Sequence, residues 1–173
     1  MHPEVDNFIE EVKKKHPEFF NSKRVLEVGS QDINGSVRKH FLYCDYTGID
    51  LGEAEGVDLV SDIVDYDHPD VFEVVISSEM LEHCKTWERA LSQMYKNLKP
   101  GGLFILTCAG PKRQEHGTGN HTPQDSKFTL DWYRNISVED FLSVLPESNF
   151  SESSLGLYRG ECDLYFYGIK KAL

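Results

Sequence analysis

The apolar run Arg24-Val25-Leu26-Glu27-Val28, which stops at Gly29, places the strongest constraint on what this chain folds into. Its three aliphatic residues suit a strand that is covered on both faces. Gly29 and Gly35 permit a positive φ or the close approach of a ligand to bare backbone. A carboxylate within a buried strand is costly without a partner, such as loop amides or water, so Glu27 indicates a specific role. The stretch therefore predicts a buried strand that leads into a nucleotide-binding turn.

Glu27-Val28-Gly29 resembles the first motif of the class I S-adenosylmethionine-dependent methyltransferases, in which an apolar strand ends in an acidic residue followed by a glycine-rich turn. Gln31 and Ile33 occupy the positions of the family's next two glycines, so the resemblance implies a longer or differently bent loop. The rival dinucleotide fingerprint requires glycine at positions 29, 31 and 34, and only the first is present. NAD is therefore disfavoured, and S-adenosyl-L-methionine is the expected cofactor.

The resemblance implies cofactor contacts at the ends of the strands. Asp50 closes the second strand, where a carboxylate accepts hydrogen bonds from a ribose; a plain turn aspartate before Gly52 is the alternative. Asp62 matches the family's adenine contact, with Ile63 flanking the ring, and a solvated acidic loop is the alternative. The expected cofactor residues are Glu27, Gly29, Gln31, Gly35, Asp50, Leu51, Asp62, Ile63, Ser78 and Met80.

Strand and helix patterns alternate along the chain and end in a hairpin. Helices are expected within 1–16, 37–41, 87–98 and 137–145, and strands at 24–28, 43–51, 57–63, 71–78, 103–108, 153–158 and 163–169. Leu98-Lys99-Pro100-Gly101-Gly102, between a helix and a strand, is a second family resemblance. We expect an α/β fold with a doubly wound, mostly parallel seven-stranded sheet, the Rossmann-like methyltransferase fold, and a C-terminal antiparallel hairpin. No glycine, proline or serine tract divides the chain, which predicts a single domain over 1–173.

The N-terminal helix within 1–16 carries apolar residues at helical spacing, which predicts an amphipathic helix. Two interpretations remain for it, namely packing on the sheet and a lid over the cofactor. The segment 109–134 is too long for a plain connection, which indicates a substrate-side loop. Asp131, Trp132, Tyr133 and Arg134 offer substrate contacts there, although the two aromatic residues are more typical of a core.

Histidine titrates near neutral pH, which makes His83, His116 and His121 the candidate catalytic bases. His83 follows the fourth strand, where a packing or capping role is the alternative. Glu115, His116 and His121 together resemble a set of metal ligands, but an irregular loop does not fix their geometry, and no metal is predicted. The four cysteines form no C-x-x-C pair, which favours free thiols.

The chain holds 18 lysines and arginines against 29 aspartates and glutamates, a formal charge of −11, which disfavours nucleic acid and anionic membranes as partners. A charged N-terminus and the lack of a long apolar stretch predict a soluble, cytoplasmic protein. Ser77-Ser78-Glu79-Met80 replaces the motif of base-modifying relatives, which disfavours methylation of bases.

The predicted function is methyl transfer to a small-molecule acceptor. The sequence indicates neither the acceptor nor the oligomeric state. Methylation of a protein side chain or another reaction of the same cofactor is one alternative. A noncatalytic module that binds S-adenosylmethionine or a partner is another.

Overall fold

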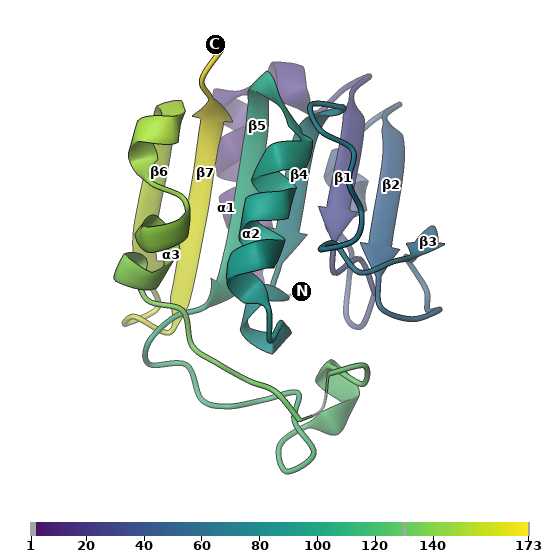
Figure 1. The fold of residues 1–173 in the computed structure, drawn as a ribbon, viewed down its shortest axis with the longest axis vertical. Coiled ribbons are helices and arrows are strands. Elements are labelled where there is room, and N and C mark those ends of the chain that lie inside the picture. The colour runs from purple at the N-terminus through teal and green to yellow at the C-terminus, as the bar shows by residue number, and fades with distance from the viewer. Residues whose placement is uncertain (1–2, 130, 173) are drawn as a thin grey trace.

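Seven strands form one sheet in the computed structural model, which describes residues 3–129 and 131–172. The order across the sheet is β3-β2-β1-β4-β5-β7-β6 (Figure 1). The strands are β1 (Arg24–Val28), β2 (Asp45–Asp50), β3 (Leu59–Val60), β4 (Phe72–Ser78), β5 (Leu98–Ala109), β6 (Phe150–Tyr158) and β7 (Asp163–Lys170). Strands β1 to β5 pair in parallel, whereas β7 runs antiparallel to both β5 and β6. The predicted fold class is confirmed, including the C-terminal hairpin.

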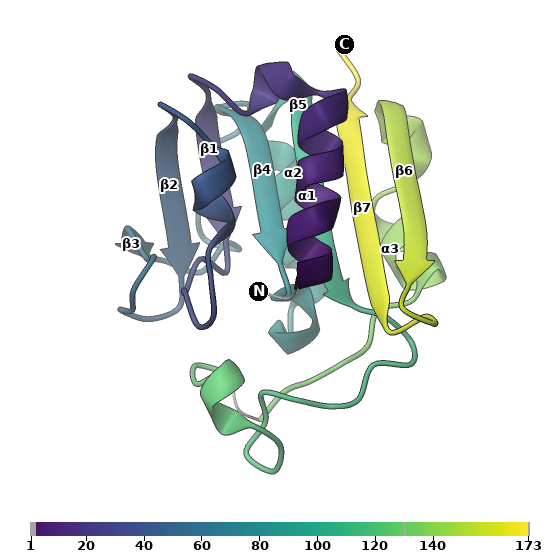
Figure 2. The ribbon, with the colours of Figure 1, turned by 180° about the vertical axis from the view of Figure 1, so that it is seen from behind.

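Helices cover both faces of the sheet. Helix α1 (Pro3–Lys15) lies on one face, and α2 (Trp87–Asn97) and α3 (Val138–Val144) lie on the other (Figures 1 and 2). Short 3₁₀ turns span Pro17–Phe19, Val37–His40, Leu81–His83, Pro123–Asp125 and Glu147–Asn149. Among the described residues, no helix combines the length and the apolar character that crossing a membrane requires.

The apolar side of α1 packs on the sheet. Val5, Phe8, Ile9 and Val12 are buried in one cluster with residues of β1, β4, β5 and β7. Sheet packing, the first of the two interpretations of this segment, is therefore what the structure shows. Positions 1 and 2 of the predicted helix lie outside the described residues.

The third strand is much shorter than expected. The sequence predicts a strand over 57–63, but only Leu59 and Val60 pair, and they pair with β2 at the edge of the sheet. Both side chains are largely exposed, at 45% and 47%, so little burial supports a longer strand. The fifth strand is longer than expected, because pairing with β4 begins at Leu98 and resumes at Leu103. The register of pairing shifts across the proline-glycine segment between them, so the strand is irregular there.

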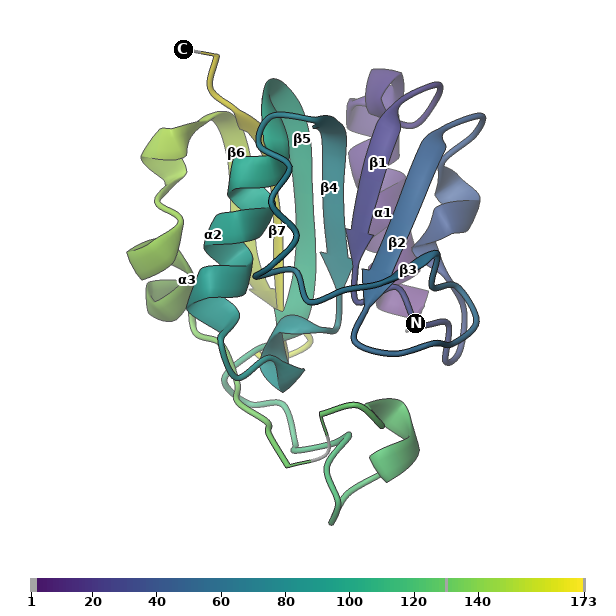
Figure 3. The same cartoon turned by 45° about the vertical axis from the view of Figure 1, so that its right-hand side comes forward.

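The described residues of segment 109–134, which the sequence predicts to be a substrate-side loop, lie beyond the carboxyl ends of β1, β2 and β4 (Figure 3). The segment leaves the sheet after β5 and returns to α3, and the turn Pro123–Asp125 is its regular element among the described residues. Two backbone hydrogen bonds fix its return: Arg134 N donates to Glu82 O at 2.8 Å, and Ile136 N donates to Ala109 O at 2.9 Å. In open parallel sheets, ligands bind at this edge.

Candidate functional site

A cavity of about 980 Å³ is lined by residues at the carboxyl ends of the parallel strands and by residues of the 109–134 loop. Every residue that the sequence proposes for cofactor binding or catalysis lines it. These residues are Glu27, Gly29, Gln31, Gly35, Asp50, Leu51, Asp62, Ile63, Ser78, Met80, His83, His116 and His121. The fold thus brings together side chains from the ends of β1, β2 and β4 and from the loop. Their individual roles remain predictions.

The turn after β1 depends on bare backbone at Gly29. This residue has a φ of 79°, and a Cβ atom there would lie 2.5 Å from Cγ of Met80. The amides of Gly29 and Ser30 both donate to the carbonyl of Ile49, at 3.0 and 3.1 Å, which ties the turn to β2. A larger residue at position 29 would therefore displace Met80 from the cavity wall.

The loop that follows lacks the family's usual glycines and is closed by Asp32 instead. The Asp32 carboxylate accepts a hydrogen bond from the amide of Gly35 at 2.6 Å. The amide of Asp32 donates to the carbonyl of Glu55 at 2.8 Å, so the loop is also fixed to the segment after β2. The different bend that the sequence indicates thus has a local cause, an aspartate side chain that holds a turn.

Glu27 is 4% exposed, and its partner is a side chain rather than the loop amides or water that the sequence suggests. The hydroxyl of Tyr46 donates to Oε2 of Glu27 at 2.9 Å. Glu27 pairs with Gly48 across β1 and β2, so Tyr46, two residues earlier, projects from the same face. Burial raises the pKa of Glu27 to about 8, although the Tyr46 hydrogen bond and the charge of Arg38 favour the ionised form.

Asp50 ends β2 with its carboxylate held by two backbone amides. Gln31 N donates to Oδ2 at 3.0 Å, and Leu51 N donates to Oδ1 at 2.7 Å. Burial raises the pKa of this carboxyl, and the two amides oppose the shift. Each oxygen keeps a lone pair for a further donor, so the carboxylate is oriented and able to accept hydrogen bonds from a ligand in the cavity.

Asp62 and Ile63 follow β3 in different environments. Asp62 is exposed, and its Oδ1 accepts a hydrogen bond from Val64 N at 2.9 Å. Ile63 is 4% exposed and belongs to the hydrophobic core beneath α2, while it also lines the cavity. The pair therefore offers a polar edge beside an apolar surface, which suits a flat heteroaromatic ring.

The three candidate histidines differ in their surroundings. His83 lies on the 3₁₀ turn after β4 and is 5% exposed, and burial, reinforced by His116, lowers its pKa to about 4. Its ring is therefore neutral and a weak base at neutral pH. His116 is partly buried, with its ring centroid 5.0 Å from that of His83 and its plane nearly perpendicular. His121 is exposed on the loop.

Two glutamates with buried carboxylate groups, Glu79 and Glu82, were not singled out from the sequence. Glu82 is 0% exposed, and neither glutamate has a hydrogen-bond partner of normal geometry for its carboxylate oxygens among the described residues. Burial raises the pKa of Glu82, and the like charge of Glu79 adds to the shift. The signal in the sequence is two acids, Glu79 and Glu82, within the four residues before His83, where an apolar strand ends.

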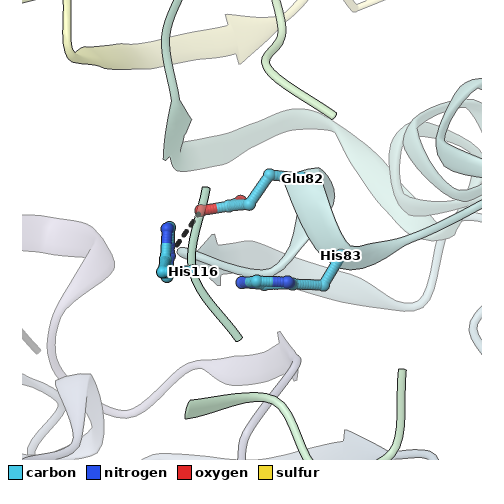
Figure 4. A group of neighbouring side chains, drawn as sticks. All are labelled: Glu82, His83 and His116. Carbon is cyan, nitrogen blue, oxygen red and sulfur yellow. Dashed lines mark ion pairs between the residues drawn. The ribbon is translucent and has the colours of Figure 1, made fainter. Parts of the chain in front are cut away.

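The loop residues Glu115, His116 and His121 do not form one group of potential metal ligands. Oε1 of Glu115 instead accepts a hydrogen bond from Thr118 Oγ1 at 2.8 Å. Within the part of the chain that the structure describes, the group whose potential ligand atoms meet is Glu82, His83 and His116 (Figure 4). The regular turn after β4, rather than the loop alone, positions two of these three residues.

The aromatic residues at the end of the loop are not in the core. Trp132 and Tyr133 are both partly exposed, and Trp132 lines the cavity. The ring of Tyr133 lies against His83 and His116, with centroid distances of 5.5 and 5.0 Å. Both residues therefore shape the cavity region rather than the interior of the domain.

The chain matches a known protein family over most of its length. Residues 4–150 match the family described as Methyltransferase domain. The chain belongs to this family. This membership confirms the class I S-adenosylmethionine-dependent methyltransferase family indicated by Glu27-Val28-Gly29, and with it the predicted cofactor.

Individual relatives are distant. A probable S-adenosylmethionine-dependent methyltransferase of Mycolicibacterium smegmatis is 28% identical over 91 residues, which cover 51% of this chain and 32% of that protein. Phosphoethanolamine N-methyltransferase 2 of Haemonchus contortus, solved with S-adenosyl-L-methionine, superposes with a TM-score of 0.70 at 16% identity over 96% of this chain and 53% of its own.

A third relative is the 1,6-didemethyltoxoflavin-N1-methyltransferase of Burkholderia thailandensis, with a TM-score of 0.61 at 15% identity over 91% of this chain and 75% of its own. Both solved structures show the shared fold. The chain spans about a third of the mycobacterial protein and about half of the nematode enzyme. A single domain over 1–173 therefore remains a prediction.

Proposed function

We propose that this methyltransferase domain transfers a methyl group from S-adenosylmethionine to a small-molecule acceptor held between the strand ends and the 109–134 loop. The observation that carries the proposal is one cavity that is lined both by the expected cofactor residues at the ends of β1, β2 and β4 and by histidines of the loop. When bound, the cofactor supplies a methyl carbon activated by a positively charged sulfur.

The residues at the strand ends fit such a cofactor. Asp50 presents an oriented carboxylate that suits ribose hydroxyls, and Gly29 leaves bare backbone at the cavity wall. Asp50 and Asp62 line the cavity, so its wall carries carboxylates that suit a cationic ligand. Gln31 and Leu51 hold Asp50 through their backbone amides, which makes them positioning residues for the ribose contact.

The acceptor side is the 109–134 loop. Displacement at a methyl group requires alignment of the nucleophile above all, and a loop that closes one side of the cavity provides such alignment. His121 is an exposed imidazole on the cavity wall and is placed to take a proton from an acceptor, whereas the lowered pKa of His83 makes it a poorer base. Two enzymes of the same fold are named for the methylation of small molecules, phosphoethanolamine and 1,6-didemethyltoxoflavin, which supports a small-molecule acceptor here.

Calorimetry with S-adenosylmethionine, S-adenosylhomocysteine and NAD tests this proposal. We expect the first two to bind with one site per chain and NAD to show no heat of binding. Binding of NAD without S-adenosylmethionine would overturn the proposed function. Binding of S-adenosylmethionine with no methyl transfer to a panel of oxygen, nitrogen and carbon acceptors would instead favour the noncatalytic module.

A further inference from the structure

Glu82, His83 and His116 meet where the loop crosses the end of β4 (Figure 4). One ligand atom from each side chain lies within 4.8 Å of the other two. We propose that these three residues bind one divalent metal ion through a carboxylate oxygen and two imidazole nitrogens. The site goes beyond the proposed methyl transfer and does not depend on it.

Glu82 provides the first argument for a cation. Its side chain is 0% exposed, and neither carboxylate oxygen has a hydrogen-bond partner of normal geometry in residues 3–129 and 131–172. Its Oε1 lies 4.0 Å from Nε2 of His116, which is too far for a hydrogen bond. A buried carboxylate without a partner is costly, and a metal ion between these two atoms would supply the missing partner.

Each of the two histidines has a ring nitrogen whose lone pair can bind a metal ion. Nδ1 of His116 lies 3.2 Å from the carbonyl oxygen of Gln114, which can only accept, so Nδ1 carries the proton and Nε2 has a free lone pair. Metal-bound histidines commonly donate their other nitrogen to a backbone carbonyl in this way. His83 is 5% exposed, and its Nδ1 has no partner among the described residues. Both rings are therefore suited to donate to a metal.

The surrounding chain holds the two rings together. Gly117 has a φ of 62°, and a Cβ atom there would lie 2.6 Å from Cε1 of His83, so the glycine allows the loop to approach that ring. Tyr133 contacts both rings from another side, and its hydroxyl donates to the carbonyl of Gln114 at 3.2 Å. The same carbonyl thus fixes His116 and Tyr133, which preorganises the site.

The ligand set selects the type of metal. Two imidazoles and a carboxylate favour first-row divalent ions such as Mn²⁺, Co²⁺ and Zn²⁺. Bonds of about 2.0–2.2 Å place ligand atoms roughly 3–3.5 Å apart, so binding draws His116 toward Glu82. Glu79, whose carboxylate is likewise buried without a partner of normal geometry among the described residues, adds negative charge beside the site.

The histidines also suggest what the metal would contact. His83 and His116 line the cavity, whereas Glu82 lies behind them, so the open coordination positions would face the cavity. An acceptor that carries a hydroxyl or carboxylate oxygen is therefore the class of molecule that fits. This statement about the acceptor rests on the proposed function, whereas the metal site does not.

The test is titration of Mn²⁺ into the full chain after removal of metals, measured by calorimetry. We expect one Mn²⁺ per chain, displaced by Zn²⁺, which such ligands bind more tightly. Glu82→Gln and His116→Ala should each weaken Mn²⁺ binding at least about tenfold, by comparison with the losses seen when metal-site residues are changed. His68→Ala removes an exposed histidine outside the cavity and should leave Mn²⁺ binding unchanged.

The metal site would be overturned if the chain bound no stoichiometric Mn²⁺. It would also be overturned if Mn²⁺ bound with equal affinity to the wild type, Glu82→Gln and His116→Ala. His116 lies on the loop, so its variant decides the question if the buried Glu82 variant does not fold. Titration of S-adenosylmethionine into the metal-free chain separates the two proposals. If S-adenosylmethionine binds and Mn²⁺ does not, only the metal site is overturned. If Mn²⁺ binds and S-adenosylmethionine does not, only the proposed function is overturned.

Discussion

Replacing Glu27 with glutamine should change the pH dependence of stability, because this carboxyl is buried within the sheet. The Tyr46 hydroxyl remains a donor to the glutamine side-chain oxygen, so the main hydrogen bond survives. Burial raises the pKa of Glu27 from its ordinary 4.5 to about 8. Between these values the folded chain holds a proton that the unfolded chain releases, so the free energy of unfolding falls as pH rises. This contribution to stability is fully present below pH 4.5 and is lost through pH 8.

The size of the effect follows from the two pKa values. Each pKa unit corresponds to about 1.36 kcal/mol. Relative to its value well below pH 4.5, the free energy of unfolding of the wild type therefore falls by about 1 kcal/mol at pH 5 and by about 3 kcal/mol at pH 7. Glu27→Gln has no proton to release at this position. The variant should therefore gain about 2–3 kcal/mol of stability relative to the wild type between pH 5 and pH 7.

Urea unfolding of the wild type and Glu27→Gln at pH 5, 6, 7 and 8 measures this difference. Other titrating groups are common to both proteins, so the difference between them isolates position 27. Glu11→Gln, an exposed position on α1, is the charge-matched control and should track the wild type at every pH. A stability difference that stays constant from pH 5 to pH 8 would refute the argument that Glu27 is protonated in the folded chain.

Three further predictions concern the cavity. Asp50→Ala should weaken S-adenosylmethionine binding by about 1–3 kcal/mol in calorimetry, because ribose hydroxyls lose a charged acceptor; unchanged affinity in the folded variant would remove Asp50 from the site. His121→Ala should lower turnover at least about tenfold once an acceptor is known while leaving cofactor affinity intact, and normal turnover would reduce the loop histidine to a surface group. Gly29→Ala should cost about 1–3 kcal/mol more in urea unfolding than Gly101→Ala, because both have positive φ but only Gly29 would clash with Met80. Equal losses for the two glycine variants would show that Met80 moves aside freely.

The sequence alone determined the fold and the general position of the site. Apolar runs and their spacing predicted most strands, because burial on both faces of a parallel sheet leaves a direct mark on composition. Gly29 and Asp50 could be placed at strand ends from the chain itself, since a strand that stops at a glycine or an acid marks its own end. The family match and the sheet order confirmed that interpretation of the fold.

The tertiary structure decided the partners of the buried charges. Tyr46 reaches Glu27 only because β2 lies beside β1 in a particular register, which no local pattern specifies. Glu82, His83 and His116 likewise meet because a loop that follows β5 returns across the end of β4. Local sequence records the periodicity and turn chemistry of each element, but contacts between distant segments depend on how the sheet assembles. The chemistry of this site arises from those long-range contacts.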